Sequence, residues 1–305
     1  IGFTDHDALP DEKSLKILKE NNNHPTKWIV GIEISSGLPK GMKGSSGGFH
    51  ITGLFVDPFN KDLLEHCKKS KEARIKRMEK TVKNLQNLGF DITTKECLKA
   101  SEDATVGRPH IVRVLKSKEK NLKIMEEIRL RMKKDGEKDP KIKKKYDKMM
   151  EFGKHQYPYE LFLSGDSYIK DVYVGYFYHP DMDKSVSLIR NAGGLAFVAH
   201  WFTAKNEITE EVLDKLFADD RLDGAETVYG LWTGINITRK DMDKERMILQ
   251  KLIKKHKKLE SGGVDAHCTE DFELFAKEKW YAKRTIGMVE KIIEKSGVET
   301  TWSSL

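Results

Sequence analysis

The sequence has no long hydrophobic run. Its apolar stretches are a few residues long, far below the roughly 18–20 residues that a membrane-spanning helix needs. Hydrophobic residues make up 38% of the chain and charged residues 34%, a composition typical of a folded, soluble protein rather than a disordered one. At 305 residues the chain can form one barrel-sized domain with an insertion, or two domains. We therefore expect a soluble protein with no membrane partner.

Cysteine is scarce. Cys67, Cys97 and Cys268 are the three cysteines, and no two of them have the Cys-x-x-Cys spacing. An odd number without paired spacing argues against a disulfide framework and favours reduced thiols, as in a cytoplasmic protein. Cys268 follows His267 and could lie near a functional site, but we interpret it as a buried thiol.

The positive charge is unevenly distributed. The chain has a net charge of +7, and residues 116–148, with 14 Lys and Arg against 7 Asp and Glu, contain the whole excess. Such a segment can attract a polyanion such as a nucleic acid, or can be no more than a solvated helical face. Tyr146 is its one aromatic residue, so the segment does not indicate stacking on bases.

Short apolar runs that end in, or just before, His, Asp or Glu recur along the chain. This pattern is typical of buried strands that deliver polar side chains to one face of an α/β barrel. The polar residues of these runs are His6, Glu33, His50, His200, Asp265 and His267. Imidazole and carboxylate together, without thiolate, suit Zn, Mn or Fe. For any one of these residues alone, the alternative is a hydrogen-bonded buried polar group.

The periodicity predicts short strands alternating with helices, which favours a parallel α/β sheet. We predict strands at residues 1–7, 27–35, 49–56, 195–199, 222–229 and 262–265. We predict helices at residues 8–24, 60–88, 94–101, 183–191, 207–218, 241–256, 272–277 and 284–295, with a charged helical segment at 116–155 that breaks at Gly136 and Pro140. The middle of the chain has no strong strand, so we expect a first barrel part (1–57), a helical insertion (58–165) and a second barrel part (166–305).

Six motifs in this order carry a family resemblance. They are TDHD (4–7), GIEIS (31–35), His-Ile-x-Gly-Leu (50–54), GRPH (107–110), AGGLAFVAH (192–200) and GGVDAH (262–267). The chain resembles the polymerase and histidinol phosphatase (PHP) superfamily, and within it the nucleoside 3′,5′-bisphosphate phosphatases and short-RNA 5′→3′ exonucleases. The resemblance implies a distorted seven-stranded (β/α) barrel with a helical insertion. Members of the family begin with a strand bearing His-x-His, and we expect that strand to be missing from this chain.

The resemblance also implies roles for individual residues. Glu33 would bridge two metal ions, His50 and His200 would complete the shell of the second, Asp265 would bind the first, and His6 and His267 would bind the third. Residues implied to be catalytic are His6, Glu33, His200 and His267. Arg108, His110 and Arg113 would bind the substrate phosphate from the insertion, and the guanidinium fork of arginine suits phosphate oxygens. The alternative for residues 108–110 is a helix N-terminus with incidental charges.

The function that follows is that of a metal-dependent phosphoric ester hydrolase using two or three divalent ions of Mn, Zn or Fe. Its substrate would be a phosphomonoester or the end of a short nucleotide or oligonucleotide such as RNA, attacked by metal-bound hydroxide. The alternative is a degenerate, non-catalytic barrel that acts as a nucleic-acid-binding or regulatory module. That alternative rests on the missing ligands and the basic segment. A PHP domain associated with a polymerase is a third possibility.

Overall fold

The computed structural model describes residues 1–305 except 43–48, 102–104, 155, 176–177, 231–237 and 267–268. The described chain divides into two compact units. The first combines Ile1–Lys68 with His179–Leu305, and the second is Lys69–Tyr178. The predicted insertion, residues 58–165, overlaps the second unit.

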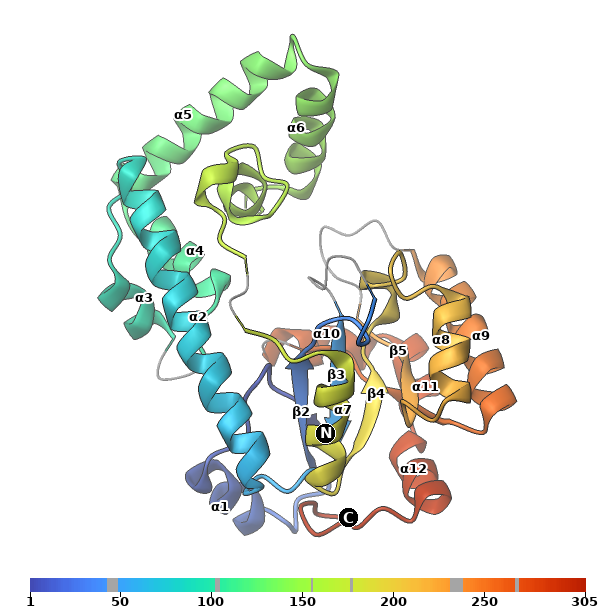
Figure 1. The fold of residues 1–305 in the computed structure, drawn as a ribbon. Coiled ribbons are helices and arrows are strands. Elements are labelled where there is room, and N and C mark those ends of the chain that lie inside the picture. The colour runs from blue at the N-terminus through green and yellow to red at the C-terminus, as the bar shows by residue number, and fades with distance from the viewer. Residues whose placement is uncertain (43–48, 102–104, 155, 176–177, 231–237, 267–268) are drawn as a thin grey trace. The chain divides into compact units, whose positions relative to one another are not determined.

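The first unit is built on a curled sheet whose six strands follow the order of the chain (Figure 1). The strands are β1 (Gly2–Phe3), β2 (Ile29–Ser35), β3 (His50–Leu54), β4 (Leu195–Val198), β5 (Gly224–Val228) and β6 (Leu259–Gly262). β1 and β6 are the two ends of this order. The mixed α/β, barrel-like class is confirmed, whereas the seven-stranded barrel with a missing first strand stays a prediction.

The prediction of a wholly parallel sheet was wrong at β3. This strand is antiparallel to both β2 and β4, while β1–β2, β4–β5 and β5–β6 are parallel. The described part of the connection between β2 and β3 contains no helix, and antiparallel neighbours do not need the helical crossover that parallel strands use. As a result the N-terminal end of β3 meets the C-terminal ends of β2 and β4, with Ser35 opposite His50.

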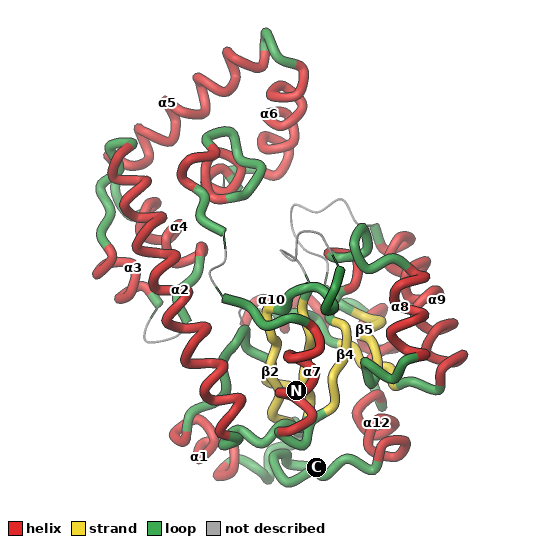
Figure 2. The backbone as a smooth tube through the Cα atoms, in the orientation of Figure 1, coloured by secondary structure: helices red, strands yellow, loops and turns green. Residues whose placement is uncertain are grey.

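Helices cover the sheet of the first unit (Figure 2). They are α1 (Glu12–Glu20), α7 (Met182–Asn191), α8 (Glu210–Ala218), α9 (Arg239–His256), α10 (Thr269–Lys277), α11 (Lys279–Thr285) and α12 (Met288–Ser296). Leu213, Leu216 and Phe217 of α8, three and four residues apart, form one buried stripe in the same core as Ile32 of β2 and Val198 of β4. The core therefore holds the ends of the strands in place.

Some predicted boundaries were wrong. The last strand ends at Gly262, so Asp265 follows the strand instead of ending it. The predicted helix 284–295 is two helices, separated at Gly287, which has φ 78°. The helix predicted over residues 8–24 is confined to α1, where the side chain of Asp11 accepts a hydrogen bond from the Ser14 N–H and caps its start.

The second unit is helical, and its described residues contain no strand. It contains α2 (Lys61–Asn87) from Lys69 onward, followed by α3 (Thr94–Ala100), α4 (Arg108–Lys116), α5 (Glu119–Gly136) and α6 (Pro140–Phe152). A π-helical turn follows at Tyr159–Leu163. Its own core joins Met78, Leu85, Leu115, Met132 and Phe162. The predicted breaks at Gly136 and Pro140 are confirmed by the ends of α5 and α6.

Among the described residues, no helix combines the length and the hydrophobicity needed to cross a membrane.

Candidate metal centre

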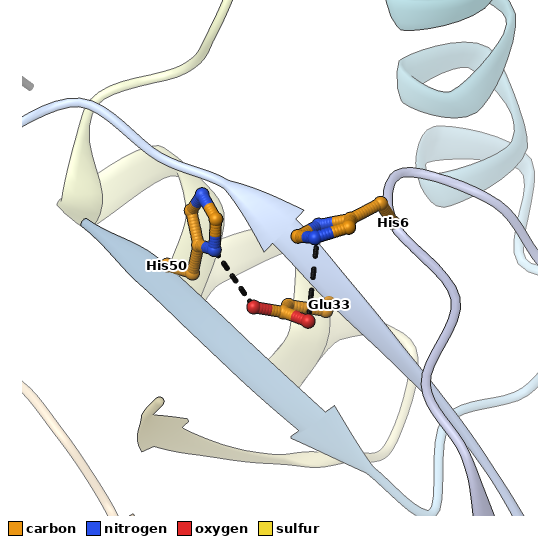
Figure 3. Close-up of side chains that lie close together, drawn as sticks. All are labelled: His6, Glu33 and His50. Atoms are coloured by element: carbon orange, nitrogen blue, oxygen red, sulfur yellow. Dashed lines mark hydrogen bonds and ion pairs between the residues drawn. The ribbon is translucent and has the colours of Figure 1, made fainter. Parts of the chain in front are cut away.

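A buried carboxylate on β2 lies among three imidazole rings. Glu33 Oε1 lies 2.8 Å from His50 Nδ1 and 2.9 Å from His200 Nε2, and Glu33 Oε2 lies 3.8 Å from His6 Nδ1. Figure 3 shows Glu33 between His6 and His50, which approach it from different segments of the chain. Glu33 is only 6% exposed. Four of the six predicted ligands therefore meet at one end of the sheet.

The backbone places His6 beside Glu33. After β1 ends, His6 forms an isolated parallel bridge with Glu33. The Glu33 N–H donates to the carbonyl of Asp5 over 3.1 Å, and the Asp7 N–H donates to the carbonyl of Glu33 over 2.8 Å. The chain from Asp5 to Asp7 thus continues the pairing of β1 with β2 and brings the His6 ring to the carboxylate.

His200 is fixed at its backbone and at both ring nitrogens. It follows β4 with φ 24° and ψ 62°, in the left-handed region that non-glycine residues rarely adopt. Its N–H donates to Glu226 Oε2 over 2.9 Å, and its Nδ1 lies 3.1 Å from Thr203 Oγ1. These contacts aim Nε2 at Glu33 and leave the ring a single orientation. Fixing a ligand in this way is how surrounding residues usually orient a metal-binding histidine.

The charges in the site shift the pKa values of its groups. Burial alone would raise the pKa of Glu33, but the charge of His6 and the hydrogen bonds with His200 and His50 hold it well below its ordinary value. Burial alone would lower the pKa of His200, but Glu33, Glu226 and Asp265 raise it to about 9. Burial, together with Asp265 and Glu33 and against the opposing pull of His200, raises the pKa of Glu226 to about 7. Without a metal ion, these shifts favour an ionised Glu33 and a protonated His200 at neutral pH.

A second buried pair, Asp7 and His66, holds the segment that follows His6 in place. Asp7 Oδ1 accepts a hydrogen bond from the Ser35 N–H over 3.0 Å and lies 3.2 Å from His66 Nε2 on α2. The side chains of Asp7 and His66 are each 1% exposed. Asp7 has φ 50°, a conformation that Asp tolerates better than most residues. This pair ties the segment after His6 to the end of β2 and to α2.

The donor atoms present fit a divalent ion. One ligand atom each from His6, Glu33 and His50 lies within 4.8 Å of the other two. Two imidazoles with a carboxylate form the mixed nitrogen and oxygen set that Zn, Mn and Fe accept. His200 reaches the same carboxylate oxygen as His50, so it adds a further nitrogen to the set.

The remaining predicted residues fall into two groups. Asp265 lies after β6 with φ 49°, and its charge acts on both His200 and Glu226, which places it near them. His267 lies outside the described residues. The three predicted phosphate-binding residues, Arg108, His110 and Arg113, all lie on α4 in the second unit.

Within that unit, the three side chains of α4 contact nearby backbone. Arg108 donates to the carbonyl of Leu163 over 3.2 Å, and Arg113 donates to the carbonyl of Ala100 over 2.9 Å. His110 Nδ1 accepts the N–H of Gly107, the residue that caps the helix. The alternative interpretation of residues 108–110, a helix N-terminus, is correct for the local structure, and phosphate binding stays a prediction.

Two residues of the site were missed as functional candidates. Glu226 stood in a predicted strand with its side chain facing one side, and Asp7 belongs to the same Asp-His-Asp cluster as His6. The available signals were a carboxylate within a short apolar strand for Glu226 and a carboxylate next to a candidate ligand for Asp7. Neither was separable by sequence from an ordinary turn or strand residue, because their partners, the N–H groups of His200 and Ser35, are backbone atoms from distant segments.

No protein-family model matches the chain, and no curated protein matches it significantly. Several solved structures are similar, and two of them are described here. A protein assigned as a metal-dependent phosphoesterase from Bifidobacterium adolescentis has a TM-score of 0.62 and 19% identity, over 96% of this chain and 85% of that one. An amidohydrolase from Chromobacterium violaceum, solved with sulfate and without metal, has a TM-score of 0.58 and 19% identity, over 88% and 78%. At this identity the likeness is one of fold, and the chain has the mixed α/β, barrel-like fold that it shares with both proteins.

Proposed function

We propose that the chain is a metal-dependent hydrolase that cleaves phosphoesters at the site around Glu33. The observation that carries the proposal is the single buried carboxylate approached by His6, His50 and His200. Buried charges of this kind are retained where they are paired or bind metals. The likeness to a protein assigned as a metal-dependent phosphoesterase supports the proposal, as does the sulfate, a tetrahedral oxyanion like phosphate, bound in the amidohydrolase structure.

Each residue has a distinct task. Glu33 offers two oxygens, one facing His50 and His200 and the other facing His6, so it can bridge two ions. His6, His50, His200 and Asp265, with His267, would complete the ligand set. Divalent ions bound there would supply a Lewis acid and a water molecule of lowered pKa. A histidine of the set would donate the proton that the leaving alkoxide needs.

The proposed substrate is a phosphomonoester or the phosphorylated end of a short nucleotide or oligonucleotide. Two features support an anionic substrate larger than phosphate itself. The basic segment 116–148 spans α5 and most of α6, and Arg108 and Arg113 lie on α4. One guanidinium group can donate two parallel hydrogen bonds to two oxygens of a phosphate, whereas a lysine ammonium acts as a point charge. We assign Arg108 and Arg113 to the phosphate-binding set on this ground, and His110 with them because the family resemblance implies it.

The test is release of phosphate from adenosine 3′,5′-bisphosphate with added Mn²⁺. We expect turnover by the unmodified chain, loss of turnover with a chelator, and loss in Glu33→Gln. His24→Gln is the matched control, because His24 is an exposed residue before β2. Full activity in Glu33→Gln would refute the assignment of the site. Turnover of amide substrates in place of phosphoesters would keep the site but move the reaction class to that of the amidohydrolase neighbour.

The second candidate function is a non-catalytic module that binds nucleic acid. The observation in its favour is the charge of α5 and α6, where many lysines are exposed, for example Lys120, Lys133 and Lys144. This candidate predicts salt-sensitive binding of short RNA with no hydrolysis at any metal concentration. Hydrolysis that depends on Glu33 would exclude it.

A further inference from the structure

A polar pocket in the first unit is lined by residues other than those around Glu33. It has a volume of about 260 Å³ and is formed by α9, β6, α11 and α12. Its charged lining residues are Arg246, Lys283, Arg284, Lys291, Lys295 and Glu260. Five cationic side chains therefore face one carboxylate. None of these residues belongs to the candidate metal centre.

The single carboxylate of the pocket is already engaged. Glu260 Oε1 accepts hydrogen bonds from Thr227 Oγ1 over 2.5 Å and from Gln250 Nε2 over 2.8 Å. It also lies 3.7 Å from the Arg246 guanidinium. The Glu260 carboxylate is thus bound by residues of β5 and α9, and its single negative charge neutralises at most one of the five cations.

The lysines of the pocket are uncompensated. Lys283, Lys291 and Lys295 are exposed, and the described residues offer none of them a carboxylate within 4.0 Å. Arg284 does have a partner, since it lies 3.2 Å from Asp243 and stacks over Trp280. Like charges gathered in one concave surface repel one another and attract an anion from solution.

We propose that this pocket binds a small phosphate-bearing anion. A phosphate group carries up to two negative charges and several acceptor oxygens, which matches two guanidinium groups and three ammonium groups better than a carboxylate does. The pocket, at about 260 Å³, admits a phosphate group with a small substituent and is too small to enclose a nucleic-acid duplex. The site is therefore a small-molecule site, separate from the proposed catalytic centre.

The experiment is calorimetric titration of the chelator-treated protein with pyrophosphate, repeated in Glu33→Gln so that the metal centre contributes nothing. We expect binding with a dissociation constant below about 1 mM, and at least about tenfold weaker binding in the double variant Lys291→Ser/Lys295→Ser. Both lysines are exposed on α12, so the variant should keep its melting temperature. Acetate, the carboxylate probe, should not compete.

The matched control removes the same charge from α9 outside the pocket, in Lys240→Ser/Lys251→Ser. This control should bind pyrophosphate as the unmodified chain does. The proposal is overturned if pyrophosphate does not bind at about 1 mM, or if the control and the pocket variant lose affinity equally. Either result leaves the function proposed for the Glu33 site untouched.

Discussion

One carboxylate oxygen, Glu33 Oε1, lies within hydrogen-bonding distance of two imidazoles, 2.8 Å from His50 Nδ1 and 2.9 Å from His200 Nε2. The three residues come from β2, the start of β3 and the end of β4, and the antiparallel direction of β3 is what brings them together. When the protons on His50 Nδ1 and His200 Nε2 leave, both nitrogens offer a lone pair beside the carboxylate oxygen. The three atoms can then bind one cation together. This relationship governs how protons and metal compete for the site.

The first prediction concerns that competition. His200 has its pKa raised to about 9, so in the metal-free protein at neutral pH it carries a proton that a metal ion must displace. Metal binding should therefore release a proton and become tighter as the pH rises towards 9. Titration with Mn²⁺ by calorimetry, in buffers that differ in ionisation enthalpy, measures the release. Heats that do not depend on the buffer would contradict this account.

The second prediction tests the role of Glu226 in positioning. In Glu226→Ala the N–H of His200 loses its acceptor, and the ring should lose the orientation that aims Nε2 at Glu33. Metal affinity should fall about 10–100-fold, the usual effect of removing a residue that orients a ligand. Glu226→Gln keeps an oxygen acceptor and should restore most of the affinity. If the Gln variant binds metal as weakly as the Ala variant, the charge of Glu226 matters rather than its hydrogen bond.

The third prediction concerns stability. Asp7→Ala removes the acceptor of the Ser35 N–H and the partner of His66, both inside the core, and should lower the free energy of unfolding by about 3 kcal/mol. Asp7→Asn keeps an acceptor oxygen and tolerates φ 50°, so its loss should be smaller. Urea unfolding of the two variants measures the difference. Equal losses would show that the hydrogen bond to Ser35 contributes nothing.

The fourth prediction concerns the packing of β5, the strand that carries Glu226. A Cβ at Gly224 would lie 2.2 Å from the carbonyl oxygen of Leu259 and 2.7 Å from the ring of Phe197, so β5 and β6 would have to separate. Gly224→Ala should cost at least about 3 kcal/mol of stability. Gly175→Ala is the control, since a Cβ there meets nothing within 4 Å. Thermal unfolding distinguishes them, and similar melting temperatures would contradict the packing described.

The sequence predicted the gathering of His6, Glu33, His50 and His200 because each follows or begins a short apolar run, and strand ends meet at one edge of a sheet. It failed on the direction of β3, since an apolar run looks the same in a parallel and an antiparallel strand. It also missed the tasks of Glu226 and Asp7, which bond to backbone groups that no pattern of side chains reveals. The pocket of Arg246 and Lys291 escaped it too, because its residues are spread over four elements.

The most direct test of the central claim is the metal content of the purified protein, measured by elemental analysis, for the unmodified chain and for Glu33→Gln. The account predicts bound Mn, Zn or Fe in the unmodified chain. It also predicts at least about a 100-fold loss of metal affinity in the variant, beyond what loss of an orienting residue causes, because the shared carboxylate itself is gone. Equal metal content in both proteins, or none in the unmodified chain after exposure to all three metals, would contradict it.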